Sequence, residues 1–501
     1  MKNTIKTRIG LFTMAFSLFL TTGCSDFLEE SDPTNITAES YFETAEHAES
    51  AVISIYSSLR SVRGGSYGGS PWLMLEFATG LADSDLGQAD NSNIIRNLTN
   101  TSDNAYGKAY WDSSYKGIAN ANLAIANIPD IAMDEAKKNR LMGEARFLRA
   151  YYYYNLVRIF GSVPLITDPI DLGSENLYAS PESVENIYAS IEEDLTLAEA
   201  SGLPFNDTTG KVTLGAVKSL LSSVYLTMAG YPLQKGNEYY QKAADKAKEV
   251  IDSDQYSLFP TYADLHDPAS NNIGENIFMV QYEAFVDPSN WQPLIIPYNM
   301  NISAYSEQTG AIYANQNFIQ SYEAGDKRVE EKEFYYTTYT SKFDRNETVV
   351  LGGYFLYKHF DIVANLETAS SDLNWDLIRY AEVLLIYAEA QNEISGPTID
   401  TEEALNKIRR RAELPEYSGL SKEQFREAVW KEKWHELSYE NVTWFDMVRL
   451  RKALNVTSGS FEDFVGHTFA YGPTLTAREL LFPIPTDELR NNENLVQNPG
   501  Y

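Results

Sequence analysis

Apolar residues recur at three- and four-residue steps along most of the chain, which is the period of a helix packed on one face. Near the N-terminus the repeat runs through Ala45, Ala48, Val52, Ile55 and Leu59. The pattern predicts helices over about residues 40–59, 134–159, 181–199, 212–229, 238–252, 376–393, 401–412 and 422–453. The short segments between neighbours indicate that these helices form antiparallel pairs.

Small residues lie where two of these pairs would cross, Ala388 with Ala404 and Ala229 with Ala243. Such residues let two helices pack closely, as in degenerate tetratricopeptide units. The regular spacing of about 34 residues is not kept, because the SGPT turn at 395–398 lengthens one loop. We therefore predict a mainly α fold, with a scaffold of tetratricopeptide-like helix pairs over about residues 40–260 and 376–455.

Residues 261–375 have a different pattern, rich in glycine, asparagine, proline and tyrosine. Alternating or aromatic runs predict short strands at NIFMVQY (276–282), FYYTTYT (334–340) and GGYFLYKHF (352–360). This segment is predicted to be a loop-rich insertion on the helical scaffold. Loops held by a rigid scaffold are frequent binding sites.

The chain begins with the pattern of a secretory signal sequence. Lys2, Lys6 and Arg8 precede an apolar run from residue 9 to 20, which spans only about 18 Å as a helix and is too short for a bilayer core of roughly 30 Å. Gly23 before Cys24 is similar to the bacterial lipoprotein processing site. We predict a signal peptide over 1–23, a lipidated Cys24 and a tether over 24–39; the alternative for Cys24 is a buried thiol.

The net charge of the chain limits the kinds of molecule that it can bind. The chain carries 70 Asp and Glu against 40 Lys and Arg, a formal net charge of −30. Nucleic acid is an unsuitable partner, because its binding depends on cations that neutralise phosphates. The basic cluster at 409–411 closes a predicted helix, where cations favour the C-terminal dipole. Acids at 26, 29, 30 and 32 resemble the signal that directs lipoproteins of the Bacteroidota to the outer cell surface.

The sequence offers no specific catalytic or metal-binding pattern. Ser66 lies in a G-x-S-x-G match, but a helical pattern precedes it and Pro71 follows, which is the wrong context for a nucleophile elbow. The five histidines lack metal-ligand spacing. Asp83, Asp85 and Asp90 resemble a calcium loop, although Gly87 occupies a ligand position and no glutamate closes the loop. We expect no cofactor and no enzyme activity, with calcium as the open alternative for these aspartates.

Aromatic residues are abundant, at 7 Trp, 34 Tyr and 23 Phe. Tyr151 and Tyr152 are predicted to pack, with Tyr153 or Tyr154 more exposed. Tryptophans 430, 434 and 444 have helical spacing and are predicted to be core.

Trp72 and Trp291 lie in glycine-, proline- or asparagine-flanked stretches, where a ring suits stacking on a sugar; the alternative is that they belong to the core. Asp83, Tyr298 and Tyr305 are the predicted polar partners of sugar hydroxyls.

Several segments together resemble the SusD-like (RagB/SusD) family of outer-membrane glycan-binding lipoproteins. They are the stretch from CSDFLEESDPTNIT to ISIY (24–56), EARFLRAYYYYNLVRIFGSVPLI (144–166), IRYAEVLLIYAEAQNE (378–393), ALNKIRRRAEL (404–414), WKEKWHELSYENVTWFDMVRLRKA (430–453) and LFPIPTDELRNNENLVQNPGY (481–501). The resemblance spans nearly the whole mature chain and places a single SusD-like domain over residues 40–501. Glu432-Lys433 and Asn441 depart from the usual family pattern.

The resemblance implies a scaffold of four tetratricopeptide-like helix pairs with a variable part that carries ligand contacts. It also implies a partner, a SusC-like TonB-dependent transporter in the outer membrane, over which the protein acts as a lid. The resulting hypothesis is a non-catalytic lipoprotein on the cell exterior that captures oligosaccharides for import. Two alternatives remain open, a surface glycoside hydrolase and a transporter lid for peptides without a carbohydrate site.

Overall fold

The computed structural model of the protein describes residues 41–64, 69–84, 90–171 and 173–501. The predictions for the signal peptide, the tether, Cys24, Ser66 and Asp85 concern residues outside these ranges. Residues Thr44–Tyr501 form one unit, to which the following description refers.

Helices dominate this unit, and their N-termini are set by local side chains. Asp134, Ser183 and Thr213 each accept a hydrogen bond from a backbone N–H in the first turn of the helix that follows, the usual N-cap arrangement. The helices are α3 (Ala45–Ser57), α4 (Leu73–Phe77), α5 (Asp90–Arg96), α6 (Ala105–Asn127), α7 (Glu135–Phe160), α8 (Val184–Glu199), α9 (Leu214–Ala229), α10 (Asn237–Ile251), α11 (Gln316–Gln320), α12 (Tyr380–Ser395), α13 (Ile399–Arg411), α14 (Lys422–Glu436), α15 (Thr443–Leu450) and α16 (Thr486–Asn491).

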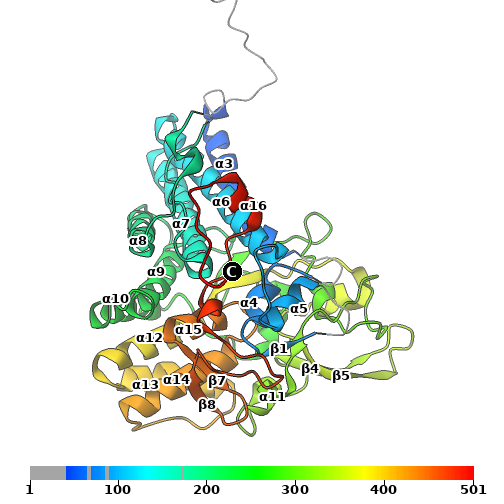
Figure 1. Cartoon of the computed structure of the whole chain (residues 1–501). Coiled ribbons are helices and arrows are strands. Elements are labelled where there is room, and N and C mark those ends of the chain that lie inside the picture. The colour runs from blue at the N-terminus through cyan, green and yellow to red at the C-terminus, as the bar shows by residue number, and fades with distance from the viewer. Residues whose placement is uncertain (1–40, 65–68, 85–89, 172) are drawn as a thin grey trace, which may run out of the picture. The chain divides into compact units, whose positions relative to one another are not determined.

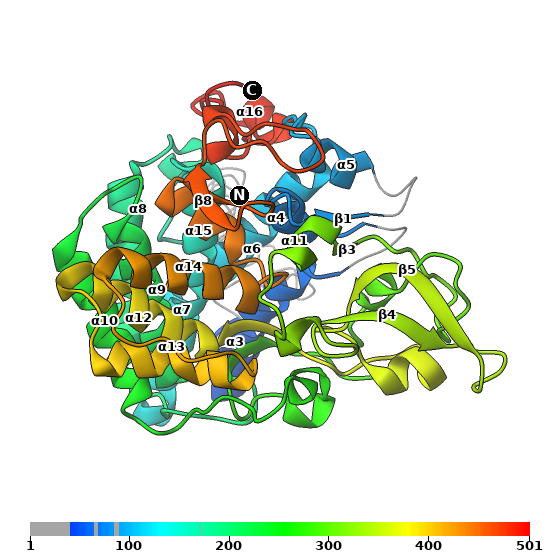
Figure 2. The ribbon, with the colours of Figure 1, turned by 90° about the horizontal axis from the view of Figure 1, so that it is seen from below.

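The long helices pack in series, each against its neighbours. Helix α7 contacts α6 and α8, α9 contacts α8 and α10, and α12 contacts α10, α13 and α14. Figures 1 and 2 show these helices gathered on one side of the unit, with the strands β4 and β5 on the other. The predicted mainly α scaffold of helix pairs with a short-strand insertion is confirmed.

One long helix, α6, has no counterpart in the sequence prediction. Its buried face consists largely of small and aromatic residues, including Gly107, Ser113, Gly117 and Ala121, so the apolar repeat is weak. Gly117 is needed for the close approach of α7, because a Cβ there would lie 2.2 Å from a ring carbon of Tyr152. Packing of this kind gives no periodic apolar signal.

Two predicted helices are interrupted. Residues 375–379 form a strand, and α12 begins only at Tyr380. The predicted helix over 422–453 is divided between α14 and α15, since Tyr439 and Asn441 have left-handed φ values of 63° and 62°. These residues turn the chain so that the side chain of Asn441 donates to the carbonyl of Trp72 at 2.9 Å.

The strands are short and form three antiparallel groups. Strands β1, β3, β5 and β4 form a sheet in that order, β2 pairs with β6, and β7 pairs with β8. Their bounds are β1 Ala82–Asp83, β2 Asn276–Val280, β3 Tyr313–Ala314, β4 Tyr335–Thr340, β5 Thr348–Leu356, β6 Trp375–Arg379, β7 Lys452–Asn455 and β8 Ser460–Asp463. Because β1 lies between α4 and α5, whereas β3, β4 and β5 belong to the insertion, the first sheet joins the N-terminal part of the chain to the insertion.

A buried ion-pair network connects the insertion to α12, α13 and α14. Glu436 is fully buried and pairs with Arg411 at 2.7 Å, Arg379 at 3.2 Å and Arg328 at 3.3 Å. Arg409 pairs with Glu432 at 3.1 Å. The basic cluster does end a helix, as predicted, but two of its three arginines are buried in this network rather than exposed.

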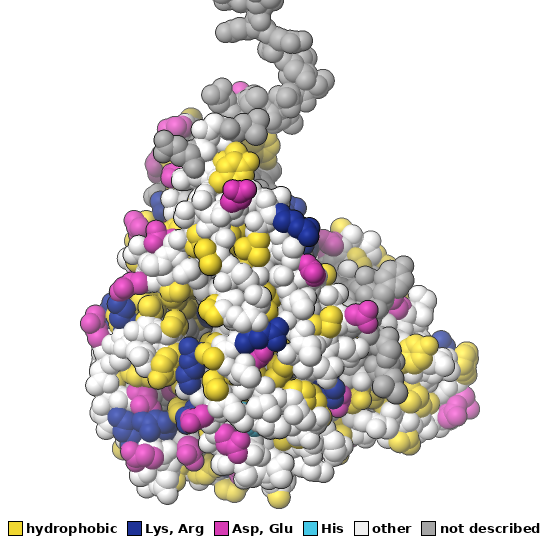
Figure 3. All heavy atoms as spheres, viewed as in Figure 1, with side chains coloured by type: hydrophobic (Ala, Val, Ile, Leu, Met, Phe, Trp, Pro, Cys, Tyr) yellow, Lys and Arg dark blue, Asp and Glu magenta, His cyan; other side chains and the backbone are white. Residues whose placement is uncertain are grey.

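No helix among the described residues combines the length and the apolar composition needed to span a bilayer. On the face drawn in Figure 3, acidic, basic and hydrophobic side chains are intermixed.

Candidate functional site

Trp72 and Trp291 come together in space, but inside the core. Both side chains are 0% exposed. Each packs on Trp375, with ring centroids 4.9 Å and 5.3 Å apart, and His359 stacks on the same Trp375 ring at 4.2 Å. The sugar-stacking prediction for these two tryptophans is therefore wrong, because their ring faces are covered by other side chains.

This aromatic cluster holds the insertion against the N-terminal part of the scaffold. His359 Nε2 lies 2.8 Å from the carbonyl of Tyr439 in the α14–α15 turn. Burial lowers the pKa of His359 to about 3, so the ring is neutral and donates this bond at neutral pH. The cluster is structural.

Of the other predictions for tyrosines and tryptophans, some are confirmed and some are wrong. All four residues of the run at 151–154 are buried, so the expected exposure of Tyr153 or Tyr154 is wrong. Their hydroxyls find partners inside the scaffold: Tyr153 donates to the carbonyl of Ile166 and Tyr154 bonds Thr227 at 2.6 Å. Trp434 and Trp444 are buried as predicted, whereas Trp430 is only partly buried.

Asp83 lies on β1, and its carboxylate forms an ion pair with an arginine. Arg96 Nη2 is 2.6 Å from Asp83 Oδ1, and the guanidinium of Arg96 stacks on Tyr471 at 4.0 Å. An ion-paired carboxylate is a poor calcium ligand, and no cluster of three or more possible ligand side chains is found within the described parts of the chain. Calcium at this loop stays the open alternative to the prediction of no cofactor, since Asp85 is outside those parts.

Tyr298 and Tyr305 belong to a set of three loops that we call the insertion tip, residues 298–305, 341–347 and 361–368. Hydrogen bonds connect the loops: Lys342 N donates to Asn301 O at 2.8 Å, and Ala304 N donates to Asn365 O at 2.6 Å. Tyr305 is 7% exposed, and its hydroxyl has no acceptor among the described residues. Burial raises the pKa of Tyr305 above its ordinary value.

The insertion tip carries exposed aromatic and apolar side chains. Tyr298 is 61% and Phe343 78% exposed, and Ile362 and Val363 are also exposed. Lys342 Nζ lies 5.3 Å from the centroid of the Phe343 ring. An exposed ring next to polar loop groups has the chemistry that binds a sugar, whose C–H face stacks while its hydroxyls form hydrogen bonds. The insertion tip is therefore the candidate binding surface.

Asp83 is too far from the insertion tip to belong to it. Asp83 pairs with Tyr313, and Tyr313 pairs with Phe355, so two strand spacings of about 10 Å in all separate Asp83 from β5. Phe355 pairs in turn with Tyr336 on β4. The β4–β5 turn begins after Thr340, four residues farther along β4, which adds about 13 Å. The structure thus places Tyr298 and Tyr305 together and leaves Asp83 apart.

Phe343 is absent from the sequence predictions. It lies in SKFDRNE, a polar stretch between two predicted strands. A large apolar residue in a polar hairpin turn is exposed by its position, and this signal could have identified it.

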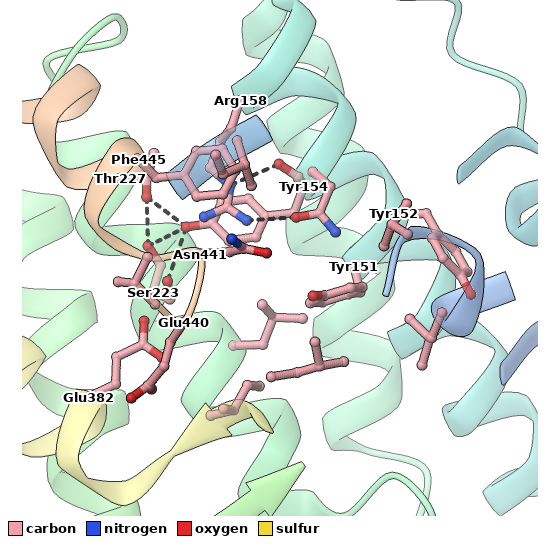
Figure 4. Close-up of a pocket in the computed structure, with 18 of the residues that line it drawn as sticks. Tyr151, Tyr152, Tyr154, Arg158, Ser223, Thr227, Glu382, Glu440, Asn441 and Phe445 are labelled. Atoms are coloured by element: carbon pink, nitrogen blue, oxygen red, sulfur yellow. Dashed lines mark hydrogen bonds between the residues drawn. The ribbon is translucent and has the colours of Figure 1, made fainter. Parts of the chain in front are cut away.

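A polar cavity of about 80 Å³ lies inside the scaffold between α6, α7, α9, α12 and the α14–α15 turn. Figure 4 shows Glu382 and Glu440 on one side of it and Tyr151 and Tyr152 on the other. Its volume is large enough for several water molecules.

Glu440 pairs with Arg379 at 2.6 Å, whereas no described residue donates to Glu382 or forms an ion pair with it. Burial raises the pKa of Glu382 to about 7, with Lys433 opposing the shift.

Replacing Glu382 with glutamine is expected to remove part of the pH dependence of stability. A carboxyl group with a pKa near 7 in the folded state and about 4.3 in the unfolded state binds more protons when folded. Stability is therefore lost as pH rises through this window, by about 4 kcal/mol for Glu382. Thermal unfolding of wild type and Glu382→Gln should agree near pH 4 and diverge toward pH 8, where the variant is more stable.

Parallel melting curves at all pH values would contradict this role for Glu382. Glu76 also has a pKa raised to about 7 by burial, so the variant should retain some pH dependence of the same sign. Asn441 N and Nδ2 donate to Glu76 at 2.6 and 2.7 Å.

The described chain thus combines helix pairs with a loop-rich insertion that exposes aromatic side chains. A family model described as "SusD family" matches residues 309–501, and one described as "Starch-binding associating with outer membrane" matches residues 26–226. A SusD-like protein P2 of Formosa agariphila is 30% identical, with 98% of this chain and 99% of that protein aligned. The chain belongs to the SusD-like family.

Solved structures agree with this assignment. A SusD superfamily protein from Parabacteroides distasonis is 39% identical with a TM-score of 0.88, over 93% of this chain and 100% of that one. Surface glycan-binding protein A from Bacteroides thetaiotaomicron, solved with laminarihexaose, is 21% identical with a TM-score of 0.72, over 91% and 99% of the two chains. The latter likeness concerns the fold alone.

Proposed function

We propose that the protein binds oligosaccharides at the cell surface and passes them to a SusC-like TonB-dependent transporter in the outer membrane. The observation that carries this proposal is membership of the SusD-like family over nearly the whole chain. The family matched over residues 26–226, which is described by starch binding and association with the outer membrane, supports both the ligand class and the location.

The insertion tip is the proposed glycan contact. It exposes Tyr298 and Phe343 on loops that hydrogen bonds hold together. Such rings accept a sugar face without a change in the scaffold, and the neighbouring backbone and side-chain groups of the loops can bond hydroxyls.

The experiment that tests the function combines partner capture with ligand binding. Affinity purification from solubilised outer membranes should recover a large barrel protein, and calorimetry against neutral polysaccharides should show binding without release of reducing sugar. Recovery of no barrel protein would contradict the transporter partnership. Release of sugar by the pure protein would favour the hydrolase alternative, and binding of peptides instead of glycans would favour the peptide lid.

Cys24→Ala is expected to abolish membrane attachment. The proposal that Cys24 is acylated rests on its position after the apolar run and Gly23. The variant, expressed with its signal sequence, should be found in soluble or unprocessed form after membrane fractionation. Ser25→Ala is the matched control and should stay in the outer membrane; equal retention of both variants would exclude the lipid anchor.

A further inference from the structure

A second pocket is lined by residues outside the insertion tip. Its volume is about 340 Å³, within the range of roughly 300–1,000 Å³ that is typical of small-molecule sites. It is lined by the C-terminal end of α7, the start of α8, the loop after α9, the end of α15 and the segments 477–481 and 498–499. These elements lie together on the side of the molecule seen in Figure 1. We call it the arginine pocket.

The charge of its lining is opposite to that of the whole protein. Among the described residues, four arginines line it, Arg158, Arg449, Arg451 and Arg478, and no aspartate or glutamate does. The chain as a whole carries a formal net charge of −30. Acidic residues are therefore plentiful in the chain, yet none of those that the structure describes forms part of the pocket wall.

Two of these arginines are already neutralised or bonded elsewhere. Arg449 forms ion pairs with Glu389 and Asp446, both at 2.6 Å. Arg478 donates to the carbonyl of Leu98 at 3.2 Å and lies 3.6 Å from Glu479.

The other two arginines have no acidic partner within ion-pair distance among the described residues. Arg158 is held between the rings of Tyr154 and Phe445, each 3.6 Å from its guanidinium carbon. Its Nε and Nη2 donate to Tyr154 O and Asn155 Oδ1, at 3.0 and 2.9 Å, which leaves Nη1 without an acceptor in the described chain. Figure 4 shows this arrangement from the cavity side.

Arg451 has fewer side-chain hydrogen bonds than Arg158. Its Nη1 donates to the carbonyl of Val448 at 3.0 Å, and its guanidinium lies over the ring of Tyr231 at 4.9 Å. Nε and Nη2 have no acceptor among the described residues. A half-buried guanidinium with a free edge is costly unless an anion or water satisfies it.

We infer that the arginine pocket binds an acidic sugar unit, through its carboxylate or sulfate group. Arg451 presents two N–H donors on one edge, the geometry that holds such a group in a bidentate manner. The rest of the wall is mostly apolar, including Val157, Pro232 and Leu481, and suits the C–H face of a sugar ring. This inference rests on the proposed glycan-binding function and adds a charged ligand class and a second site to it.

The test compares ligands that differ only in charge. Calorimetry at low salt should detect glucuronic acid and glucose 6-sulfate, with much weaker binding of glucuronic acid methyl ester and of glucose. Arg451→Gln should weaken binding of the two anions about tenfold to a hundredfold, as expected for loss of charged hydrogen bonds. Arg410→Gln is the matched control, because Arg410 is an exposed arginine on α13, paired at 3.1 Å with Glu416. Thermal unfolding confirms that both variants are folded.

The outcomes distinguish a failure of this inference from a failure of the proposed function. If neutral oligosaccharides bind but the two anions do not, or if Arg451→Gln leaves anion affinity unchanged, the inference fails and the proposed function stands. If no saccharide binds, both fail. Inorganic sulfate that binds as tightly as glucose 6-sulfate would show a plain anion site, and Arg451-dependent binding to vesicles with anionic lipid, without saccharide binding, would show a membrane contact. Either result overturns the acidic-sugar assignment.

Discussion

Trp72→Ala and Trp291→Ala are each expected to lower the free energy of unfolding by about 3–5 kcal/mol, the usual cost of removing a large aromatic side chain from a core. Both rings are fully buried against Trp375, and truncation leaves a cavity that the neighbouring segments cannot fill without moving. Denaturant unfolding of the purified variants measures the loss. For variants that remain folded, glycan affinity should be close to that of wild type, because neither ring is available to a ligand.

The matched controls are Tyr298→Ala and Phe343→Ala on the insertion tip. Their exposure predicts a change in stability within about 0.5 kcal/mol. If either ring is an anchor for the glycan, truncation should cost roughly 2 kcal/mol of binding, or about thirtyfold in affinity. The opposite result, stable tryptophan variants that lose binding and tip variants that bind normally, would return the glycan site to the tryptophans.

Glu436→Gln is expected to destabilise the protein by about 3–5 kcal/mol at neutral pH, since it leaves buried arginines without their shared anion. Glu436 is the carboxylate common to Arg328, Arg379 and Arg411. Burial raises the pKa of Glu436, but these arginines lower it more, so the net pKa is below its ordinary value. The stabilising effect is thus present above a pH of about 4.3 and is lost as pH falls through the lower pKa of the folded state.

The control for Glu436 is Glu403→Gln, which removes an exposed partner of Arg410 on α13. Exposed ion pairs of this kind contribute only about 0–1 kcal/mol. Urea unfolding at pH 7 compares the two substitutions directly. Equal effects of Glu436→Gln and Glu403→Gln would show that the buried network does not stabilise the link between the insertion and α12–α14.

Local sequence patterns were sufficient to predict much of the helical scaffold. The helix predicted over 134–159 is α7, Glu135–Phe160, because its apolar repeat, its cap at Asp134 and its stop at Gly161 are all short-range signals. Helix α6 shows the limit of such signals, since its buried glycine and serine positions become informative only when α7 is packed against them.

The candidate site was predicted only in part. Tyr298 was found because it lies in a loop-rich insertion, and loops are exposed. The same argument failed for Trp291, although its flanking residues are also typical of loops, because the loop folds back over the ring. Arg451 gave no signal at all, since an arginine at a helix end is ordinary until its lack of an acidic partner is known.

The sequence by itself determined the helix-pair scaffold, the short-strand insertion and the family, because helical periods, caps and extended motifs are properties of contiguous residues. Only the tertiary structure decided that Trp72 and Trp291 share a buried cluster, that Arg411 meets Glu436, and that four arginines from separate segments line one pocket. Burial and charge pairing depend on which distant segments come into contact, and the order of residues along the chain does not contain that contact explicitly.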